Sequence, residues 1–228
     1  MEILLIALFL VLIIGGAIYG HYRSEQRKQA LAEFARQHGW QFSPDTQRDV
    51  ESRYAAFSCL QQGSDRYAYN IFEGQAAERD ICGFDYHYAT HSTDSKGRRT
   101  THHHYFSAIV VEVPLDLKPL VIRPEGFFDK ITELLGFDDI DFELAEFSRK
   151  FCVKADDRRW AYDIIQQSTM EFLLHAPQFT IQLAGHHVMA YRAQLFDPAD
   201  FEQALEVIGG VVDRLPGYLI RELKGVEK

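Results

Sequence analysis

The sequence lacks the short motifs that mark common catalytic and nucleotide-binding sites. It contains no GxSxG motif of nucleophile-elbow hydrolases, no GxxxxGK[ST] motif of P-loop proteins and no GxGxxG motif of dinucleotide-binding folds. The sequence therefore gives no support to these three classes. Cysteine is scarce: Cys59, Cys82 and Cys152 are widely spaced and form no CxxC pair. This usage is typical of a reducing compartment rather than a disulfide framework, although one disulfide with a spare cysteine also fits it.

Positive charge is in deficit. The chain has 24 Lys and Arg against 33 Asp and Glu, a formal net charge of −9. Residues 1–28 hold three basic and two acidic side chains, so the remaining body carries −10. Because such a body is repelled by phosphate backbones, nucleic acid is not an expected partner.

The amino-terminal segment has no charged side chain from Ile3 to Gly20. Eighteen helical residues at about 1.5 Å rise span roughly 27 Å, close to the hydrocarbon thickness of a bilayer. We therefore predict a transmembrane helix with a basic flank in residues 1–28 and a single soluble domain in residues 29–228. The predicted membrane-anchor residues are Ile3, Leu4, Leu5, Ile6, Leu8, Phe9, Leu10, Val11, Leu12, Ile13, Ile14 and Ile18.

A cleaved signal peptide is the alternative to this anchor. Signal peptides begin with a basic region and carry about 7–15 apolar residues, whereas here Glu2 follows Met1 and the apolar run is longer. Cleavage after Ala17 stays open as the other interpretation. Arg23, Arg27, Lys28 and Arg36 all follow the apolar run, which predicts a single-pass protein of the cell membrane with its body in the cytoplasm.

The body mixes strand and helix patterns. Residues 27–38 have a helical apolar stripe that ends at Gly39, and aromatic and β-branched segments predict strands at 54–60, 66–72, 79–91, 102–113 and 151–154. A short helix is predicted at 125–135 and a longer one from Asp156 or Asp157 to about His175. Residues 179–183 and 188–192 flank a predicted hairpin turn with Gly185 at its first central position.

The last predicted helix has the clearest pattern of the body. Asp197 is its expected N-cap, Pro198 its first residue, and Pro216-Gly217 its end. Its buried stripe is predicted to contain Phe201, Ala204, Leu205, Ile208, Val212 and Leu215. The fold class is therefore α+β: an N-terminal transmembrane helix followed by an antiparallel sheet or a partly closed barrel with covering helices, for which a pleckstrin-homology-like barrel is one fitting form.

Three local motifs resemble those of a family of uncharacterised bacterial proteins. They are Gly39-Trp40 after a short juxtamembrane helix, Asn70-x-x-x-Gly74 within strands, and residues 83–88, Gly-Phe-Asp-Tyr-His-Tyr. The resemblance covers about the first half of the chain. It implies one N-terminal membrane segment and a soluble α+β domain, and it implies no activity and no functional residues.

Histidine is concentrated around one predicted hairpin. Pairing the strands about Lys96-Gly97 would place His91 opposite His102, and period-two alternation would put His104 on the same face. His91, His102 and His104 are therefore candidate ligands for zinc or another transition metal, with Asp85 or Cys82 as a further ligand. A solvated hairpin end is the simpler interpretation, and a slip of one residue would turn His102 and His104 to the other face.

The leading functional hypothesis is a membrane-tethered, non-catalytic interaction or scaffolding domain. It is expected to bind the bilayer through the first helix. It is also expected to bind a protein partner, whose identity the sequence does not give. No cofactor is expected. Gly16-x-x-x-Gly20 leaves self-association as a homo-oligomer open. The alternative is a metal-dependent enzyme or metal sensor that uses the histidine-rich hairpin.

Overall fold

The structure, a computed structural model, describes residues 2–126 and 140–224, and the side chains from Phe9 onward. The chain begins with one long helix, α1, over Glu2–Gln37. The elements that follow, in order, are β1 (Gln41–Ser43), α2 (Val50–Arg53), the 3₁₀ turn η1 (Ser58–Gln61), β2 (Ser64–Ala76), β3 (Arg79–Thr93), β4 (Arg99–Pro124), α3 (Ala145–Lys150), β5 (Phe151–Ala155), α4 (Arg158–Ile164), α5 (Gln167–His175), β6 (Thr180–Arg192), α6 (Pro198–Val212) and α7 (Gly217–Leu223).

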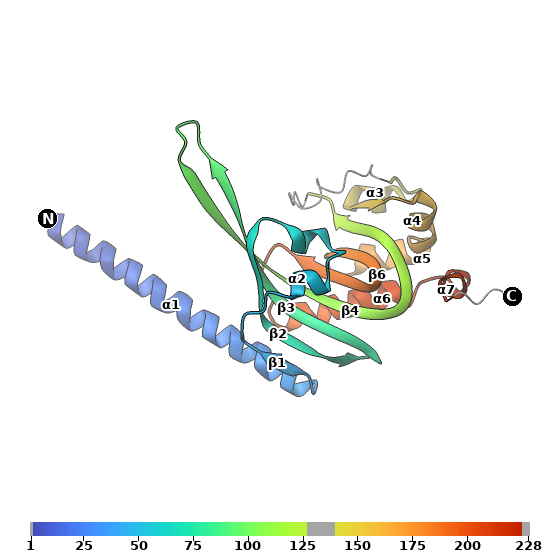
Figure 1. Ribbon diagram of the computed structural model, residues 1–228, viewed down its shortest axis with the longest axis horizontal. Helices are drawn as coiled ribbons and strands as arrows, with labels where there is room; N and C mark the ends of the chain where they lie inside the picture. Colours follow the sequence, from blue (N-terminus) through green and yellow to red (C-terminus); the bar gives the residue numbers. More distant parts are fainter. Residues whose placement is uncertain (1, 127–139, 225–228) are drawn as a thin grey trace.

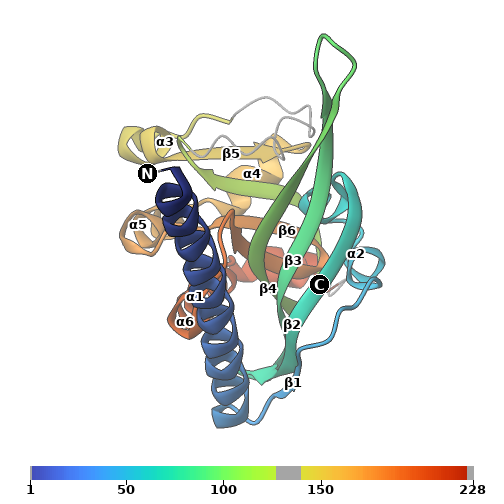
Figure 2. The same ribbon diagram turned by 90° about the vertical axis from the view of Figure 1, so that its left-hand side faces the viewer.

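Six antiparallel strands form one sheet in the order β1-β2-β3-β4-β5, and β6 also pairs with β4 (Figures 1 and 2). The α+β prediction with an antiparallel sheet and covering helices is therefore confirmed. The partly closed barrel is not found: in the described part of the chain β1 pairs with β2 and β5 with β4, so the sheet stays open. Closure requires the two edge strands to pair with each other.

The longest strand, β4, belongs to two halves of the sheet. Its first part pairs with β3 and β6, and its end pairs with β5 and β6. The β4–β6 register is irregular between Glu112 and Leu117 and between Leu117 and Leu120. Pro114 and Pro119 lie in these intervals, and because proline has no amide hydrogen it interrupts the ladder there. β4 can therefore bend from one half of the sheet to the other.

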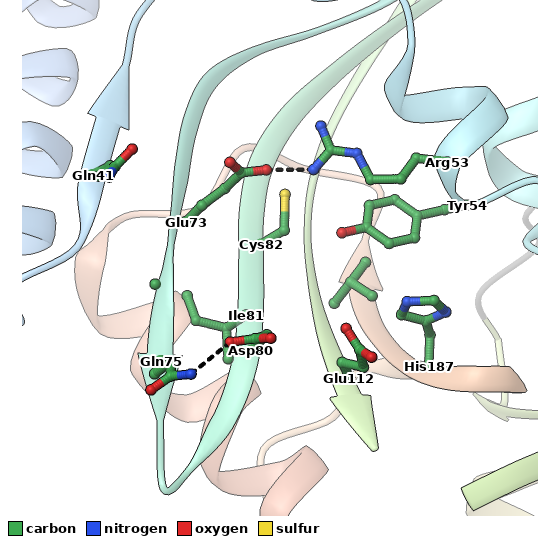
Figure 3. A pocket seen from close by; sticks show the side chains of 12 residues that line it. Gln41, Arg53, Tyr54, Glu73, Gln75, Asp80, Ile81, Cys82, Glu112 and His187 are labelled. Carbon is green, nitrogen blue, oxygen red and sulfur yellow. Dashed lines mark hydrogen bonds and ion pairs between the residues drawn. The ribbon is translucent and has the colours of Figure 1, made fainter. Parts of the chain in front are cut away.

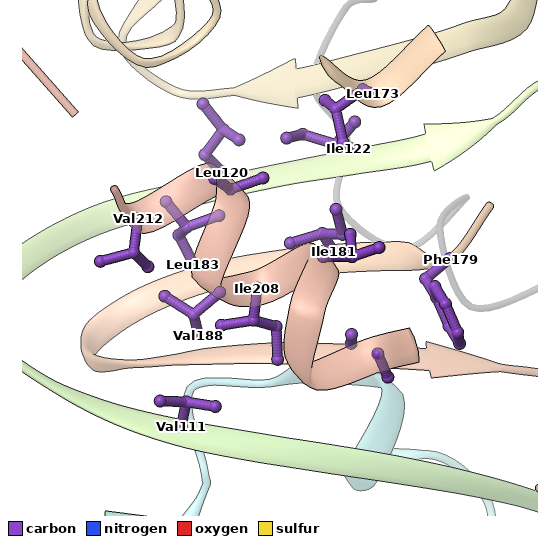
Figure 4. Packing of buried hydrophobic residues seen from close by; sticks show 14 of the residues in the cluster. Val111, Leu120, Ile122, Leu173, Phe179, Ile181, Leu183, Val188, Ile208 and Val212 are labelled. Atoms are coloured by element: carbon purple, nitrogen blue, oxygen red, sulfur yellow. The ribbon is translucent and has the colours of Figure 1, made fainter. Parts of the chain in front are cut away.

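The helices α1 and α6 cover one face of the sheet (Figure 2). Phe201 and Ile208 of α6 are fully buried there, among sheet residues such as Val111, Leu183 and Val188 (Figure 4). The predicted capping of α6 is confirmed: Asp197 Oδ1 accepts a 3.0 Å hydrogen bond from the amide of Asp200, whose side chain bonds the Asp197 amide in return. The α6 stripe is as predicted except that Leu205 is only half-buried and Val207 and Val211 are buried as well. The helix ends at Val212, before the predicted end at Pro216-Gly217, so Leu215 is buried but lies in the turn after α6.

A smaller core lies on the opposite face of the sheet. It contains Val50, Tyr54, Phe57 and Leu60 from the segment that holds α2 and η1, packed on side chains such as Phe84. The predicted strand at 54–60 is therefore wrong. Its apolar residues are buried as a strand's would be, but a short apolar run does not distinguish a strand from short helical turns.

Two further predictions need correction. The predicted hairpin over 179–192 is the single strand β6 (Thr180–Arg192), and Gly185, with φ of +55°, sits where the pairing with β4 is irregular. A lone glycine in a strand marks a bulge as readily as a turn. The single long helix predicted after Asp157 is in fact two helices, α4 and α5. Asp157 is the N-cap of α4, as expected. The helix predicted at 125–135 lies largely outside the described residues.

Candidate functional site: the junction of the first helix with the sheet

A buried ion pair joins α1 to the middle of the sheet. Asp85 of β3 is fully buried on the sheet face that α1 covers. Arg27 of α1 reaches it with both terminal nitrogens: Nη1 lies 2.6 Å from Oδ2 and Nη2 lies 2.8 Å from Oδ1. This bidentate geometry is the strong form of an arginine–carboxylate contact, and it fixes direction as well as distance.

Two neutral side chains complete the set of donors around the Asp85 carboxylate. Asn70 Nδ2 donates to Oδ2 at 2.9 Å, and the Ser107 hydroxyl donates to Oδ1 at 2.5 Å. Asn70 has φ of +48° and lies between Tyr69 and Phe72, where the β2–β3 register shifts. Asparagine tolerates this left-handed conformation better than most residues, so the bulge in β2 aims its amide at Asp85.

The same network reaches the start of α6. Arg27 Nε donates to the carbonyl oxygen of Phe196 at 2.7 Å, and the Ser107 hydroxyl accepts from the Phe196 amide at 2.9 Å. Residues from α1, β2, β3, β4 and the loop before α6 thus meet at one carboxylate. Burying a charge costs several kcal/mol unless it is paired and fully hydrogen-bonded, a condition that these donors meet.

The junction has a clear mechanical consequence. α1 runs without a break through the predicted domain boundary at residue 28, and Arg27, one residue before that boundary, belongs to the body's own network. Further along α1, Leu31, Phe34 and Ala35 are buried against the sheet. A Schellman motif ends the helix: the Trp40 amide bonds the Ala35 carbonyl at 2.8 Å, and the Gly39 amide bonds that of Arg36 at 3.1 Å.

The predicted metal ligands are not brought together. The strands pair one residue away from the predicted register, so that His91 lies opposite Thr101 and His102 opposite Thr90. Opposed residues share a face, so His91 points to one side of the hairpin, and His102 and His104 to the other. Within the described residues no group of three or more His, Cys, Asp or Glu is placed to hold a metal ion. The metal-dependent alternative is therefore not favoured.

Each histidine has other neighbours in the hairpin. His102 Nε2 lies 3.0 Å from the Ser92 hydroxyl, and the His104 ring stacks on Tyr88 at 4.6 Å between centroids. His87 is buried and its Nε2 lies 2.9 Å from His103 Nδ1. Asp85, predicted as a further ligand, is held by Arg27 instead.

An open cleft of about 510 Å³ lies over β2, β3 and β4 near α2 (Figure 3). Arg53 pairs with Glu73 at its rim, and Cys82, Tyr54 and His187 line its floor. Burial raises the pKa of the Cys82 thiol to about 12, so the thiol stays protonated at neutral pH and is a poor nucleophile. Burial also lowers the pKa of His187, which favours its neutral form. Polar and apolar side chains both line the cleft, and the charge of Arg53 is paired with that of Glu73.

Sequence reasoning missed the junction, although its residues carry a signal. Asp85 interrupts an apolar, aromatic strand, and a buried carboxylate needs a cationic or hydrogen-bonding partner. The sequence alone gives no means of choosing Arg27 among the basic residues. In the sequence, Arg27 was interpreted only as one of the basic residues that indicate membrane orientation.

The described elements define an α+β protein with a long N-terminal helix packed on an open antiparallel sheet. A solved structure shares this architecture: the mycobacterial trehalose monomycolate transport factor A, TtfA, superposes with a TM-score of 0.60 over 83% of this chain and 96% of that chain. Sequence identity is 12%, so this likeness concerns the fold alone. No family model matches the chain, and no curated protein matches it.

Proposed function

We propose that the protein is a membrane-tethered, non-catalytic interaction domain whose first helix both anchors it and sets its orientation. The observation that carries this proposal is the continuity of α1. One uninterrupted helix has an apolar amino-terminal half, exposed where its side chains are described from Phe9 on, and a carboxy-terminal half that the Arg27–Asp85 pair fixes to the sheet.

The exposed half of α1 supports a bilayer as its environment. Phe9, Val11, Leu12 and Ile18 are each 65% exposed, and the intervening apolar residues are exposed as well. A helix that is apolar on all sides needs an apolar surrounding, because contiguous exposed patches of this kind are rare in water. Tyr19 lies at the end of the apolar run and Tyr22 follows it, and tyrosines are enriched at membrane interfaces.

Within the portion of the chain that the structure describes, no helix is long and apolar enough to cross a membrane. The predicted span begins at Ile3, and its residues Ile3, Leu4, Leu5, Ile6 and Leu8 lie outside the described side chains. The single-pass anchor is therefore proposed on the sequence of residues 3–20 together with the exposure of Phe9 to Ile18. The basic residues that follow favour a cytoplasmic body.

The structure of similar fold belongs to a transport factor, and for this chain we propose an accessory role in a complex with other proteins. An interaction domain needs surfaces, and the cleft over β2, β3 and β4 offers one with both polar and apolar side chains on the face away from α1. The buried, protonated thiol of Cys82 and the half-buried imidazole of His187, whose neutral form is favoured, suit binding better than nucleophilic catalysis. No substrate or pathway is proposed.

Membrane fractionation tests this proposal. The full chain should sediment with membranes and resist extraction by alkaline carbonate, whereas a chain beginning at Arg23 should appear in the soluble fraction with a folded body. A reporter active only in the cytoplasm, fused after Lys228, should be active. Release of the full chain by carbonate would contradict the anchor, and activity of a reporter that works only outside the cytoplasm would reverse the orientation.

A further inference from the structure

The hairpin between β3 and β4 extends beyond the body with no apolar side chain at its end. Residues 91–103 are all polar or glycine, and all of them are exposed. A two-stranded ribbon without an apolar face buries little and gains little stability of its own. The extension therefore contributes nothing to either core. A role in contacts with another molecule would account for it better than a role in stability.

The hairpin extends from the body on the same side as the amino-terminal half of α1. Both run toward the upper left in Figure 1, and both point upward in Figure 2. The contact of Arg27 with Asp85 gives them a common origin. From Asp85 to Thr93 the strand covers about 26 Å at roughly 3.3 Å per residue. The same length along α1, at about 1.5 Å per residue, leads from Arg27 into the apolar run near Phe9. The tip is thus long enough to reach the surface of a bilayer that surrounds residues 3–20.

The tip carries the opposite charge to the body. Lys96, Arg98 and Arg99 outnumber Asp94, the one acidic residue of 91–103, while the chain as a whole carries −9. Asp94 organises the turn: its Oδ1 accepts hydrogen bonds from the Lys96 and Arg98 amides, both at 2.9 Å, and its Oδ2 pairs with Arg98 Nε at 3.0 Å. The turn is therefore shaped so that the cationic side chains lie at the exposed end.

We infer that this hairpin tip binds the phosphate-bearing headgroups of anionic phospholipids in the membrane that holds α1. The inference rests on the proposed anchor and adds a second, electrostatic contact to it. Each lysine or arginine near an anionic surface strengthens binding by about fivefold, and the effect falls off within a Debye length. The acidic body is repelled by the same surface, so the contact orients the domain with its hairpin toward the lipid.

The test uses the full chain with Ser95→Cys, labelled at the tip with a fluorophore, in two kinds of vesicle. One is phosphatidylcholine alone, and the other is phosphatidylcholine mixed with phosphatidylglycerol; both contain the same fraction of headgroup spin-labelled phosphatidylcholine as a quencher. Labelling is selective because Cys59, Cys82 and Cys152 are buried.

Stronger quenching in the phosphatidylglycerol vesicles, weakened by high salt, is the expected result. The triple variant Lys96→Gln, Arg98→Gln and Arg99→Gln should lose this difference. A matched variant with the same charge change, Arg149→Gln, Arg158→Gln and Arg159→Gln at exposed sites around α3 and α4, should keep it.

Flotation of the vesicles separates the two ways in which the account can fail. A chain that floats with both vesicles and is quenched equally in both overturns the hairpin inference and leaves the anchor intact. A chain that floats with neither overturns the proposed anchor, and the inference with it.

Discussion

The two halves of α1 differ in how far their side chains are buried, and the difference is the opposite of what their compositions would predict. The amino-terminal half is almost wholly apolar, and its described side chains from Phe9 to Tyr22 are exposed. The carboxy-terminal half is rich in charge, yet Leu31, Phe34 and Ala35 are buried and Arg27 is held by the sheet. Burial within a protein therefore follows which face meets a partner surface, and not how many apolar residues a segment contains.

Under the proposed anchor, the contrast explains how one helix can serve two environments. A stripe of apolar residues suffices for the half that packs on the sheet, since its other side faces water. A half that is apolar all round has no side suited to water, and a bilayer is the surrounding that satisfies all of it. Arg27 lies between the two, where its charge can reach Asp85.

Phe34→Ala should have the largest effect on the free energy of unfolding. Phe34 is 4% exposed, and its ring lies 5.4 Å from that of Trp40 and 5.7 Å from that of Phe72. Loss of this packing should cost about 3–5 kcal/mol. Phe9→Ala, at a residue 65% exposed, should change body stability by less than about 0.5 kcal/mol. Denaturant titration of both variants in detergent would measure this, and equal effects would abolish the distinction between the halves.

Arg27→Ala should come next, at about 3 kcal/mol. It leaves the buried Asp85 carboxylate without its cation, which typically costs about 3–5 kcal/mol, and water reaching the 21% exposed Arg27 site lessens the loss. Arg27→Lys should be intermediate, because lysine keeps the charge but not the bidentate geometry. Arg23→Ala is the control, since Arg23 is exposed. If Arg27→Ala unfolds no more easily than Arg23→Ala, the junction does not stabilise the fold.

Asp197→Ala should have a smaller effect, about 1 kcal/mol. It removes the N-cap bond to the Asp200 amide at the start of α6, the helix that packs beside the docked half of α1. Glu206→Ala on the exposed side of α6 should stay within about 0.5 kcal/mol. Thermal unfolding of the two variants would rank them. A harmless Asp197→Ala would mean that packing alone fixes the start of α6.

Sequence patterns predicted those elements whose signals are local. The α6 cap and stripe, the end of α1 at Gly39 and the strands around 66–72 and 79–91 follow from periodicity and capping residues. α7 was missed because Pro216-Gly217 indicates only that the preceding helix ends. The junction could not be predicted because Arg27 and Asp85 are far apart in the chain and meet only in the folded sheet.

Strand register was the other point at which local patterns failed. Residues 92–101 are polar on both faces, so no buried face selected between the predicted pairing and the observed one. That slip of one residue separates His91 from His102 and His104. Gly185 is a second case in which the local sequence fits two structures, because a lone glycine is compatible with a turn or with a bulge. Only its pairing with β4 distinguishes the two.

Hydrogen exchange along α1, measured on the full chain in lipid nanodiscs, tests the central claim most directly. Two segments should be protected from exchange: residues 9–20, which the bilayer shields, and residues 27–37, which dock on the sheet. The residues between them should exchange faster. Arg27→Ala should weaken protection of the second segment and leave the first unchanged. Exchange of residues 9–20 at the rate of a water-exposed helix, with 27–37 still protected, would contradict the account.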